Sequence, residues 1–366
     1  MSALNILALN SGSSSLKFGL YRVDSAGAEK LIGETFPTVP TADPADAMTR
    51  VASALAESGM PPPDAIGHRI VHGGPALRQH CRIDDTVLRQ LQAAAAFAPL
   101  HTPAALALIR STQARFPGIE QVACFDTQFH AGLPEVARVL PIARELLSEG
   151  MQRYGFHGLS LESIVRQLGD LVPQRLVIAH LGNGASITAL RAGRSIDTSM
   201  GLTPSGGVIM GTRSGDIDPG VLVYLMREKK FDATMLEALI DQQSGLLGLS
   251  GLSGDMRRLH EAAASNRDAR LAVEMFCMSV RKQIAAMIAV LGGLDMLVFT
   301  GGIGENDAQL RAAICSGLSW IGVSLDDSRN RSASNPVSDG PSRCRVLVLP
   351  SQEDEQIARH AWGLLT

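Results

Sequence analysis

The sequence predicts an α/β protein of two domains. Its 366 residues are enough for two domains of ordinary size, and 45% of them are hydrophobic, which supplies two cores. A strand, a small-residue turn and a second strand occur near the N-terminus, and the same pattern returns from Leu176. A third apolar strand leads through a glycine-rich segment into a helix near residue 300.

The first element is a β-hairpin. Leu4 to Leu9 form a short apolar run, and the turn from Asn10 to Ser15 follows it. Leu16, Phe18 and Leu20 then alternate with other residues, which is the period of a strand. The P-loop and the dinucleotide-binding turn both lead from a strand into a helix with a different glycine spacing, so neither is indicated.

The second hairpin resembles the first in order and spacing. Leu176 to Ala179 is an apolar strand, and the glycine-containing loop from His180 to Ser186 leads to further strands at 187–190 and 195–197. We interpret this as an internal duplication with one copy in each domain. The alternative is that the two loops are alike only because hairpin turns favour glycine and serine.

The third cluster, Phe299 to Asn306, follows the apolar run that begins at Met296. Leu310, Ala313 and Ile314 share a helical face behind it, with Asn306 or Asp307 as the N-cap. A glycine loop at a helix start directs backbone N–H groups toward a ligand, as in nucleotide sites. An exposed loop is expected from Asp326 to Arg345. Other expected helices cover residues 43–57, 87–97, 104–115, 161–168, 220–230 and 268–291.

Composition excludes several classes of protein. A formal net charge of −3 provides no basic field for a nucleic acid. Five scattered cysteines without a C-x-x-C pair indicate reduced thiols in a cytoplasm. The N-terminus lacks a basic region before its apolar run, and the stretch Leu271 to Leu291 carries charges, so we expect neither a signal peptide nor a membrane span.

Several polar residues lie at the ends of apolar strands or between glycines. A charge that is buried there costs free energy unless it is paired or binds a ligand. They are Arg69, Asp126, His157, Arg213 and Glu353. Arginines that hold carboxylate or phosphate, a histidine and metal-binding carboxylates are the groups that phosphoryl transfer needs. The structural alternatives are an ion pair of Arg69 with Asp126 or Asp64, and a hydrogen-bonded core histidine at 157.

These motifs together carry a family resemblance. In chain order they are Asn10–Lys17, Gly67–Gly74, Phe125–His130, Tyr154–Gly158, His180–Gly184, Asp197–Pro204, Gly211–Pro219, Ser244–Ser250 and Phe299–Asn306. The chain resembles the acetate and butyrate kinase family from Leu7 to about Arg359.

The resemblance implies two ribonuclease-H-like α/β domains of the actin-like ATPase fold, with ATP in an interdomain cleft. The expected domains are 1–152 plus 356–366, with the terminal helix, and 153–355, which binds the nucleotide. The family reaction is reversible phosphoryl transfer from ATP to acetate, with Mg²⁺ or alternatively Mn²⁺, in a cytoplasmic homodimer.

The resemblance also implies roles for particular residues. Asn10 and Glu353 would bind the metal, and Arg69 would bind the acetate carboxylate. Asp126, His157 and Arg213 would be catalytic, although a carboxylate nucleophile is already ionised and needs no base, so we expect Asp126 mainly to orient Arg69 or the metal. The pocket for the methyl group would be lined by Val71, Leu100, Phe156 and Pro204. The nucleotide would contact Ser13, Ser15, Lys17, His180, Leu181, Gly182, Asn183, Gly184, Asp255, Met256, Arg257, Gly302, Ile303, Gly304, Glu305 and Asn306.

The chain departs from the family pattern near the substrate pocket. Thr102 replaces the usual asparagine, Leu161 replaces a histidine, and Ser205-Gly206 replace Leu-Glu. The alternatives are therefore a kinase for propionate or another short-chain carboxylate, a pyrophosphate-dependent variant, and a catalytically silent, nucleotide-gated interaction protein on the same fold. The physiological direction and the dimer surface do not follow from the sequence.

Overall fold

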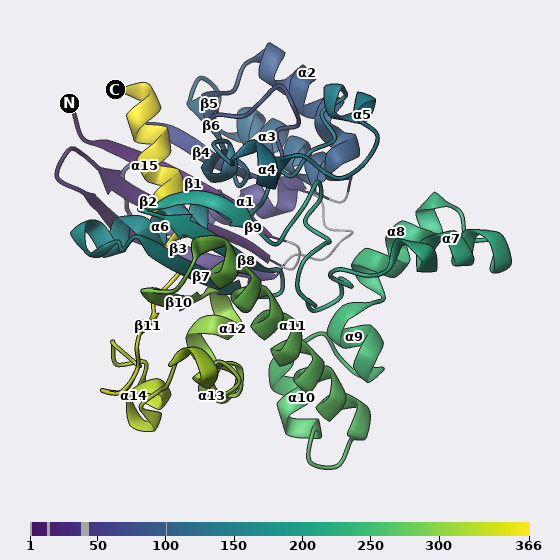
Figure 1. Cartoon of the computed structure of the whole chain (residues 1–366). Coiled ribbons are helices and arrows are strands. Elements are labelled where there is room, and N and C mark those ends of the chain that lie inside the picture. The colour runs from purple at the N-terminus through teal and green to yellow at the C-terminus, as the bar shows by residue number, and fades with distance from the viewer. Residues whose placement is uncertain (1, 13–14, 38–43, 100) are drawn as a thin grey trace. The chain divides into compact units, whose positions relative to one another are not determined.

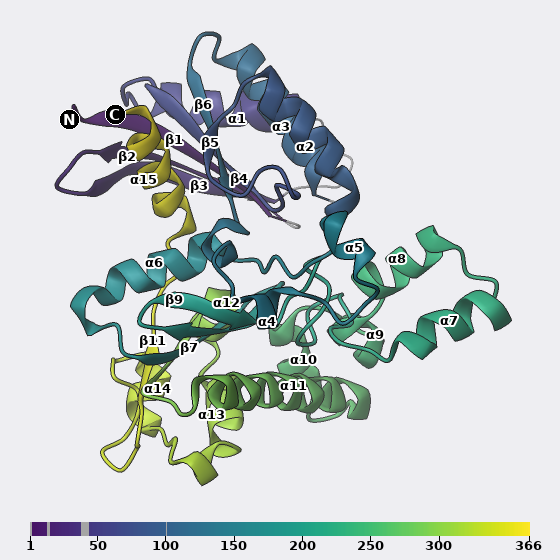
Figure 2. The ribbon, with the colours of Figure 1, turned by 45° about the horizontal axis from the view of Figure 1, so that its top comes forward.

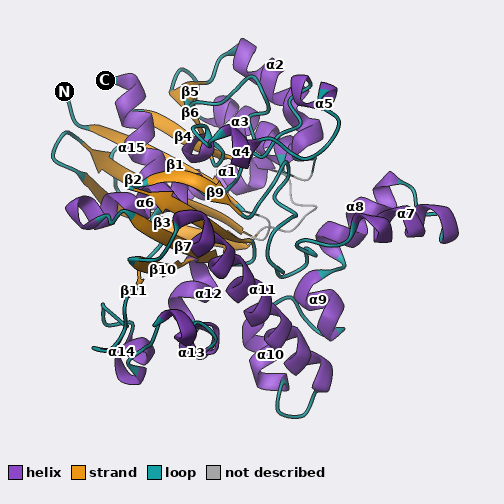
Figure 3. Cartoon of the chain, in the orientation of Figure 1, coloured by secondary structure: helices purple, strands orange, loops and turns teal. Residues whose placement is uncertain are grey.

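The computed structural model describes residues 2–12, 15–37, 44–99 and 101–366 (Figure 1). The chain forms two compact units. Unit 1 comprises Met1–Ala131, Phe156–Arg166 and Gln352–Thr366, and unit 2 comprises Gly132–Gly155 and Gln167–Ser351. Each unit contains one mixed β-sheet with helices packed against it (Figure 3).

The sheet of unit 1 has the strand order β3-β2-β1-β4-β6-β5. The first three strands form an antiparallel meander, β4 and β6 continue parallel to β1, and the short β5 is antiparallel to β6. The strands are β1 (Leu4–Ser11), β2 (Ser15–Val23), β3 (Ala28–Pro37), β4 (Ala65–Ile70), β5 (Cys81–Arg82) and β6 (Glu120–Phe125).

The sheet of unit 2 repeats this plan with the order β11-β10-β7-β8-β9. Here too three antiparallel strands come first, and two strands parallel to the first of them follow. The strands are β7 (Arg175–Leu181), β8 (Ala185–Arg191), β9 (Arg194–Thr198), β10 (Met296–Thr300) and β11 (Arg345–Val348). The shared topology confirms the internal duplication that the two hairpins predicted.

Successive side chains of β1 point to opposite faces of the unit 1 sheet, and both faces are covered. Ile6 and Ala8 face the C-terminal helix α15, whereas Leu7 and Leu9 face the opposite core, which includes α1. Figure 2 shows α15 lying along the meander. The helices of unit 1 are α1 (Pro44–Glu57), α2 (Asp85–Ala93), α3 (Thr102–Arg115), α6 (Gly158–Leu168) and α15 (Glu353–Leu365).

The longest helix, α11 (Arg267–Leu291), packs on the sheet of unit 2 through Phe276, Val280 and Ile284. Within the described ranges, no helix is both long and apolar enough to cross a membrane. The other helices of unit 2 are α4 (Glu135–Arg138), α5 (Glu145–Ser148), α7 (Pro219–Glu228), α8 (Ala233–Gln242), α9 (Gly245–Ser250), α10 (Met256–Ala262), α12 (Gly301–Asn306), α13 (Ala308–Ser316) and α14 (Asp327–Ser332).

Two segments differ from the sequence-based prediction. The glycine segment after β10 is the short helix α12 rather than a loop, because the Glu305 side chain accepts the Gly301 N–H at 3.0 Å and closes the turn. The expected exposed loop from Asp326 to Arg345 contains α14, which is capped by Asp326. Val337 in this segment is fully buried, so it packs as part of unit 2.

Candidate active site

An ion pair between Arg69 and Asp126 lies at the ends of two neighbouring strands. β4 and β6 pair in parallel, with Ile70 opposite Phe125, so their carboxyl ends bring the two side chains together. Arg69 Nε and Nη2 donate to Asp126 Oδ2 at 3.0 and 2.6 Å. The alternative partner, Asp64, instead accepts the Asn5 N–H at 2.8 Å. Asp126 is therefore the residue that orients the Arg69 guanidinium.

Burial controls the electrostatics of this pair. The side chains of Arg69 and Asp126 are only 13% and 1% exposed. Burial raises the pKa of Asp126 to about 6, although the Arg69 guanidinium opposes the rise. The surrounding carboxylates, led by Asp126, raise the pKa of Arg69 against the effect of burial. At neutral pH the pair is ionised, and a fixed cation is available for an anionic ligand.

Oxygen ligands gather beside Arg69. The Asn10 amide Nδ2 donates to Glu353 at 2.9 Å and to Asp354 at 2.8 Å, and Asn10 Oδ1 lies 3.4 Å from Arg69 Nη1. Asn10 is the second-last residue of β1, and the two acids occupy the first turn of α15. Burial raises the pKa of Asp354, and the bond from Asn10 opposes this rise. Two carboxylates and an amide oxygen form the hard donor set that Mg²⁺ and Mn²⁺ prefer.

Asp354 was not identified from the sequence. The acidic run that opens α15 marks a helix N-terminus, where acids are favourable in any helix. Only the hydrogen bond to Asn10, far away in the chain, distinguishes Asp354 as part of the site.

His157 lies at a strained turn next to Asp126. Its φ is 60°, which is rare for a residue with a side chain, and its side chain is buried. The next residue, Gly158, begins α6 and donates its N–H to Asp126 O at 2.8 Å. An added Cβ at Gly158 would lie 2.3 Å from that oxygen, so the close approach requires glycine. The turn thus fixes the backbone of His157 against the end of β6.

The apolar residues predicted to line the methyl pocket are divided between the two units. Val71 and Phe156 are buried in unit 1, where the His72 ring packs edge-on against Phe156 with centroids 5.5 Å apart. Pro204 belongs to unit 2 and is also buried. The predicted residues Leu100 and Ser13 lie outside the described residues. Ser15 and the exposed Lys17 lie in β2, and Lys17 is paired with Asn10 across the hairpin.

Unit 2 brings several of its predicted nucleotide-binding residues together. Residues 182–184 connect β7 to β8, and Asn183 O accepts the Gly211 N–H at 3.2 Å. His180 pairs with Thr300 across β7 and β10, so the following residues, Leu181 and Gly301, are adjacent. Gly301 has a φ of 78°, and an added Cβ would lie 2.7 Å from Leu181 O. The backbone of α12 can therefore approach the loop after β7 closely.

The Glu305 and Asp255 side chains stabilise their own segments. Glu305 Oε1 accepts the N–H groups of Gly301 at 3.0 Å and Ser351 at 2.9 Å, while Asn306 Nδ2 donates to Gly302 O at 2.8 Å. Asp255 caps α10 and pairs at 2.7 Å with the mostly exposed Arg257. The backbones of Ile303 and Gly304 lie within α12, and Met256 is buried at the start of α10.

Arg311 positions α12 and was not identified from the sequence. Its fully buried guanidinium donates from Nη1 to Gly304 O and Glu305 O, both at 2.9 Å, and from Nη2 to Asn330 O at 2.6 Å. In the sequence Arg311 appears as an ordinary polar position of a helix. Its guanidinium bonds to Asn330 of α14, in a segment for which the sequence predicts an exposed loop.

Arg213 lies close to Pro204 in unit 2. Its Nη1 donates to Pro204 O at 3.3 Å, and the residue remains partly exposed. A guanidinium in this setting can bind an anionic oxygen in addition to its present partners. Unit 1 thus holds a fixed arginine and oxygen ligands, and unit 2 holds a second arginine and glycine-lined backbone. These groups define the class as a phosphotransferase.

Comparisons with known proteins identify the family. A model described as the acetokinase family matches residues 33–359. The acetate kinase of Methylocella silvestris is 41% identical, over 98% of each chain. A propionate kinase structure from Francisella tularensis is 36% identical and covers 100% of both chains with a TM-score of 0.89. The acetate kinase structure from Porphyromonas gingivalis is 34% identical, covers 99% of this chain and all of that one, and has a TM-score of 0.83.

The chain therefore belongs to the acetokinase family, and it is a kinase. The predicted fold class, two α/β domains of the actin-like ATPase type, is confirmed by the two sheets and by these structural matches.

Proposed function

We propose that the protein transfers the γ-phosphoryl group of ATP to acetate and forms acetyl phosphate and ADP. The observation that carries this proposal is the Arg69 guanidinium, which Asp126 fixes in a buried position beside the oxygen ligands Asn10, Glu353 and Asp354. Arginine binds a carboxylate through parallel N–H groups. The apolar group of a small acid is proposed to lie against the buried side chains of Val71 and Phe156.

The chemistry needs no general base. The acetate carboxylate is ionised at neutral pH, so one of its oxygens attacks the γ-phosphorus directly. A new C–O–P linkage forms while the bond from the γ-phosphorus to the β,γ-bridging oxygen breaks, and ADP leaves with that electron pair. Arg69 holds the nucleophile, and Asp126 holds Arg69. His157 and Arg213 are proposed to stabilise the charge on the transferring group.

The donor set in unit 1 fits a divalent cation. Asn10, Glu353 and Asp354 would hold Mg²⁺, which typically binds one or two carboxylates and completes its shell with water and phosphate oxygens. When bound, the ion supplies charge neutralisation for the phosphate oxygens. Mn²⁺ accepts the same ligands, so metal preference is tested by comparing turnover with each ion at equal free concentration.

The nucleotide is proposed to bind to unit 2, at the residues His180–Gly184, Asp255–Arg257 and Gly302–Asn306. The support is the contact between the loop after β7 and the start of α12, which brings backbone N–H groups and small residues together. A backbone without large side chains can approach a phosphate group closely, and its N–H groups can bind the phosphate oxygens. Ser15 and Lys17 of unit 1 are proposed to contact the phosphates.

Acetate is the proposed acid, and propionate is its competitor because one structural neighbour is named a propionate kinase. One methylene changes binding by only about 1–3 kcal/mol, so discrimination between these acids is modest. The test is kcat/KM for acetate, propionate and butyrate with Mg·ATP, with the acyl phosphate trapped by hydroxylamine. The proposal requires the highest value for acetate, and a higher value for propionate would reassign the substrate.

We also propose a homodimer in the cytoplasm. α7 and α8 have no buried residues, and α7 exposes Val221, Val223, Tyr224 and Met226. Such an apolar surface is typical of an interface between copies. All five cysteines are free thiols, which is typical of a reducing compartment.

A further inference from the structure

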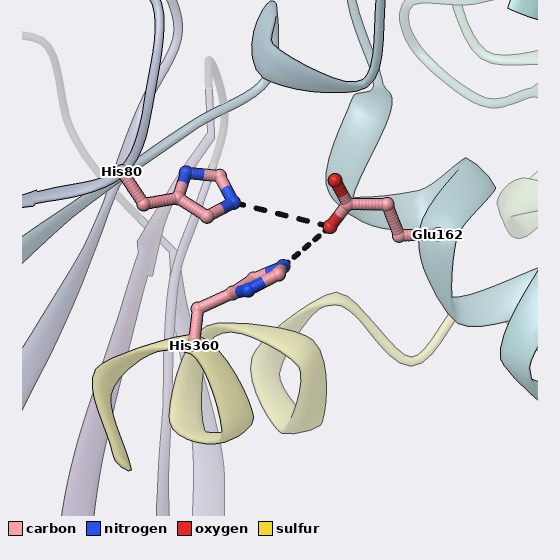
Figure 4. A group of neighbouring side chains, drawn as sticks. All are labelled: His80, Glu162 and His360. Atoms are coloured by element: carbon pink, nitrogen blue, oxygen red, sulfur yellow. Dashed lines mark hydrogen bonds and ion pairs between the residues drawn. The ribbon is translucent and has the colours of Figure 1, made fainter. Parts of the chain in front are cut away.

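Three titratable side chains from distant parts of the sequence meet in unit 1. Glu162 Oε2 lies 2.5 Å from His360 Nε2 and 3.9 Å from His80 Nε2, and the two imidazole centroids are 4.0 Å apart. Figure 4 shows both rings directed toward the same carboxylate oxygen. We call these residues the Glu162 cluster. None of them was selected as a site residue from the sequence, because no local motif connects positions 80, 162 and 360.

The spacing of the ligand atoms permits a metal ion, but the hydrogen bonds exclude one in this arrangement. The three candidate ligand atoms lie within 4.8 Å of one another. However, His80 Nδ1 accepts the Phe125 N–H at 3.0 Å, so the proton of the neutral ring is on Nε2. A metal-bound histidine shows the opposite pattern, with its second nitrogen as a donor. His80 Nε2 therefore directs an N–H toward the carboxylate.

The Glu162 carboxylate is consequently an anion that faces the N–H groups of two imidazole rings. Burial acts to raise the pKa of Glu162, but the hydrogen bond from His360 and the nearby His80 ring lower this pKa to about 2. Hydrogen bonds to an ionised acceptor are roughly twice as strong as neutral ones. His80 Nε2 lies 3.9 Å from the carboxylate, beyond hydrogen-bond distance, and the side chains of Glu162 and His80 are only 15% and 4% exposed, so water competes weakly at this contact.

Each member of the cluster is connected to a different group of the candidate active site. His80 binds the backbone of Phe125, directly before Asp126. Glu162 belongs to α6, whose first residue follows His157 and donates its N–H to Asp126 O. His360 belongs to α15, which begins with Glu353. The cluster therefore links the segments that carry Asp126, His157 and Glu353, all within unit 1.

We propose that Glu162, hydrogen-bonded to His360 and packed close to the His80 imidazole, is a positioning residue that fixes Asp126, His157 and Glu353 in their working arrangement. The inference rests on the proposed phosphoryl transfer, to which it adds three residues that do not touch the reactants. Misplacement of reacting groups by about 1 Å can lower a rate by roughly a hundredfold, so the cost of losing the cluster should appear in kcat.

A second acid provides a matched control. Glu355 also connects α6 with α15, through an ion pair with Arg166 at 3.0 Å, and its side chain is 17% exposed. It has no bond to His80 or to the segment that carries Asp126 among the interactions of the described residues. Glu162→Leu and Glu355→Leu therefore remove equally buried contacts between the same helices, but only the first breaks the link to Asp126.

The experiment compares full-length Glu162→Leu, Glu162→Gln and Glu355→Leu with the wild type. We expect Glu162→Leu to lower kcat between about tenfold and a hundredfold, with the KM for ATP within about twofold. Glu162→Gln keeps an acceptor oxygen and should restore kcat to within about threefold of the wild type. Glu355→Leu should change thermal stability but not kcat. An equal loss of kcat in both leucine variants, or no loss in either, would overturn the proposal.

A second measurement does not depend on turnover. In ¹⁵N-histidine-labelled protein, the imidazole signals of His157 should shift in Glu162→Leu and stay unchanged in Glu355→Leu. Identical His157 signals in all proteins would contradict the positioning role even if no acid proved to be a substrate. Calorimetry with Zn²⁺ alone gives a further check. Uptake of one equivalent that Glu162→Leu abolishes would make the cluster a metal site and refute the assigned tautomer.

Discussion

Arg69 donates two hydrogen bonds to one oxygen of Asp126, Oδ2, while Oδ1 of the same carboxylate is buried without a hydrogen-bond partner among the described residues. This geometry leaves Arg69 Nη1 to face Ser11 O at 3.2 Å and Asn10 Oδ1 at 3.4 Å. The aspartate thus fixes one edge of the guanidinium, and the other edge faces the oxygen-rich end of β1. Nη1 already donates to these two oxygens, so a carboxylate ligand would have to replace them, at a cation that is already oriented.

Breaking this pair should damage both stability and acetate use. Asp126→Asn removes the charge that balances buried Arg69, and loss of one partner of a buried pair costs about 3–5 kcal/mol. We expect kcat/KM for acetate to fall by about a hundredfold or more. Because the two residues act together, Arg69→Gln should add little further loss in the Asp126→Asn background. Fully additive effects in this double-mutant cycle would show that Asp126 does not act through Arg69.

Acid should destabilise unit 1 through His68. This fully buried ring bonds to Gln121 at 2.8 Å, and burial lowers the pKa of His68 to about 4, against the opposing effect of that bond. The unfolded chain binds the proton near pH 6.5, so the stabilisation is present above that value and is lost as the pH falls from about 6.5 to 4. At its full extent the loss is on the order of 3 kcal/mol.

The measurement is urea unfolding at pH 7 and pH 5, followed by the fluorescence of Trp362 in unit 1. The exposed Trp320 of unit 2 is replaced by Phe to isolate this signal. His68→Gln should flatten the pH dependence. An equally steep dependence in that variant would assign the effect to another group.

Nucleotide affinity should depend on Arg311. Arg311→Met leaves the carbonyl groups of Gly304 and Glu305 without their buried donor, and α12 should lose its defined position. A loss of about 1.5–3 kcal/mol corresponds to a rise of roughly tenfold or more in the KM for ATP, with the KM for acetate unchanged. Arg329→Met, at an exposed position of α14, is the control. Equal KM values for ATP in both variants would show that Arg311 does not position α12 for nucleotide binding.

The proposed dimer should depend on the apolar side chains of α7. Tyr224 is 56% exposed and Met226 is 51% exposed. Tyr224→Glu would place a charge in the interface, and we expect sedimentation velocity to show a monomer where the wild type is a dimer. Lys229→Gln, just beyond the end of α7, makes the same change of one charge unit and is the control. A dimer that survives Tyr224→Glu would place the interface on another surface.

The sequence predicted the groups whose signal is local. Arg69 and Asp126 were recognisable because a charge at the end of an apolar strand is costly unless it is paired or binds a ligand. Parallel strands bring such ends together. The duplicated hairpins likewise predicted two sheets of one topology. The choice between Asp126 and Asp64 as partner of Arg69 required the strand register, which a single sequence does not provide.

Long-range contacts account for what the sequence did not show. Asp354 is one of three acids in the first turn of α15, and only its bond to Asn10 separates it from an ordinary helix start. Arg311 and the Glu162 cluster are buried by elements that are distant in the chain. α12 is helical although it is rich in glycine, because Glu305 and Arg311 hold its two ends.

The most direct test of the proposed function is ³¹P NMR of the purified protein with Mg·ATP and acetate. The account predicts a resonance for acetyl phosphate that grows in equal amount with ADP and that is absent when acetate is omitted. ADP without acyl phosphate, or no consumption of ATP with acetate, would contradict it.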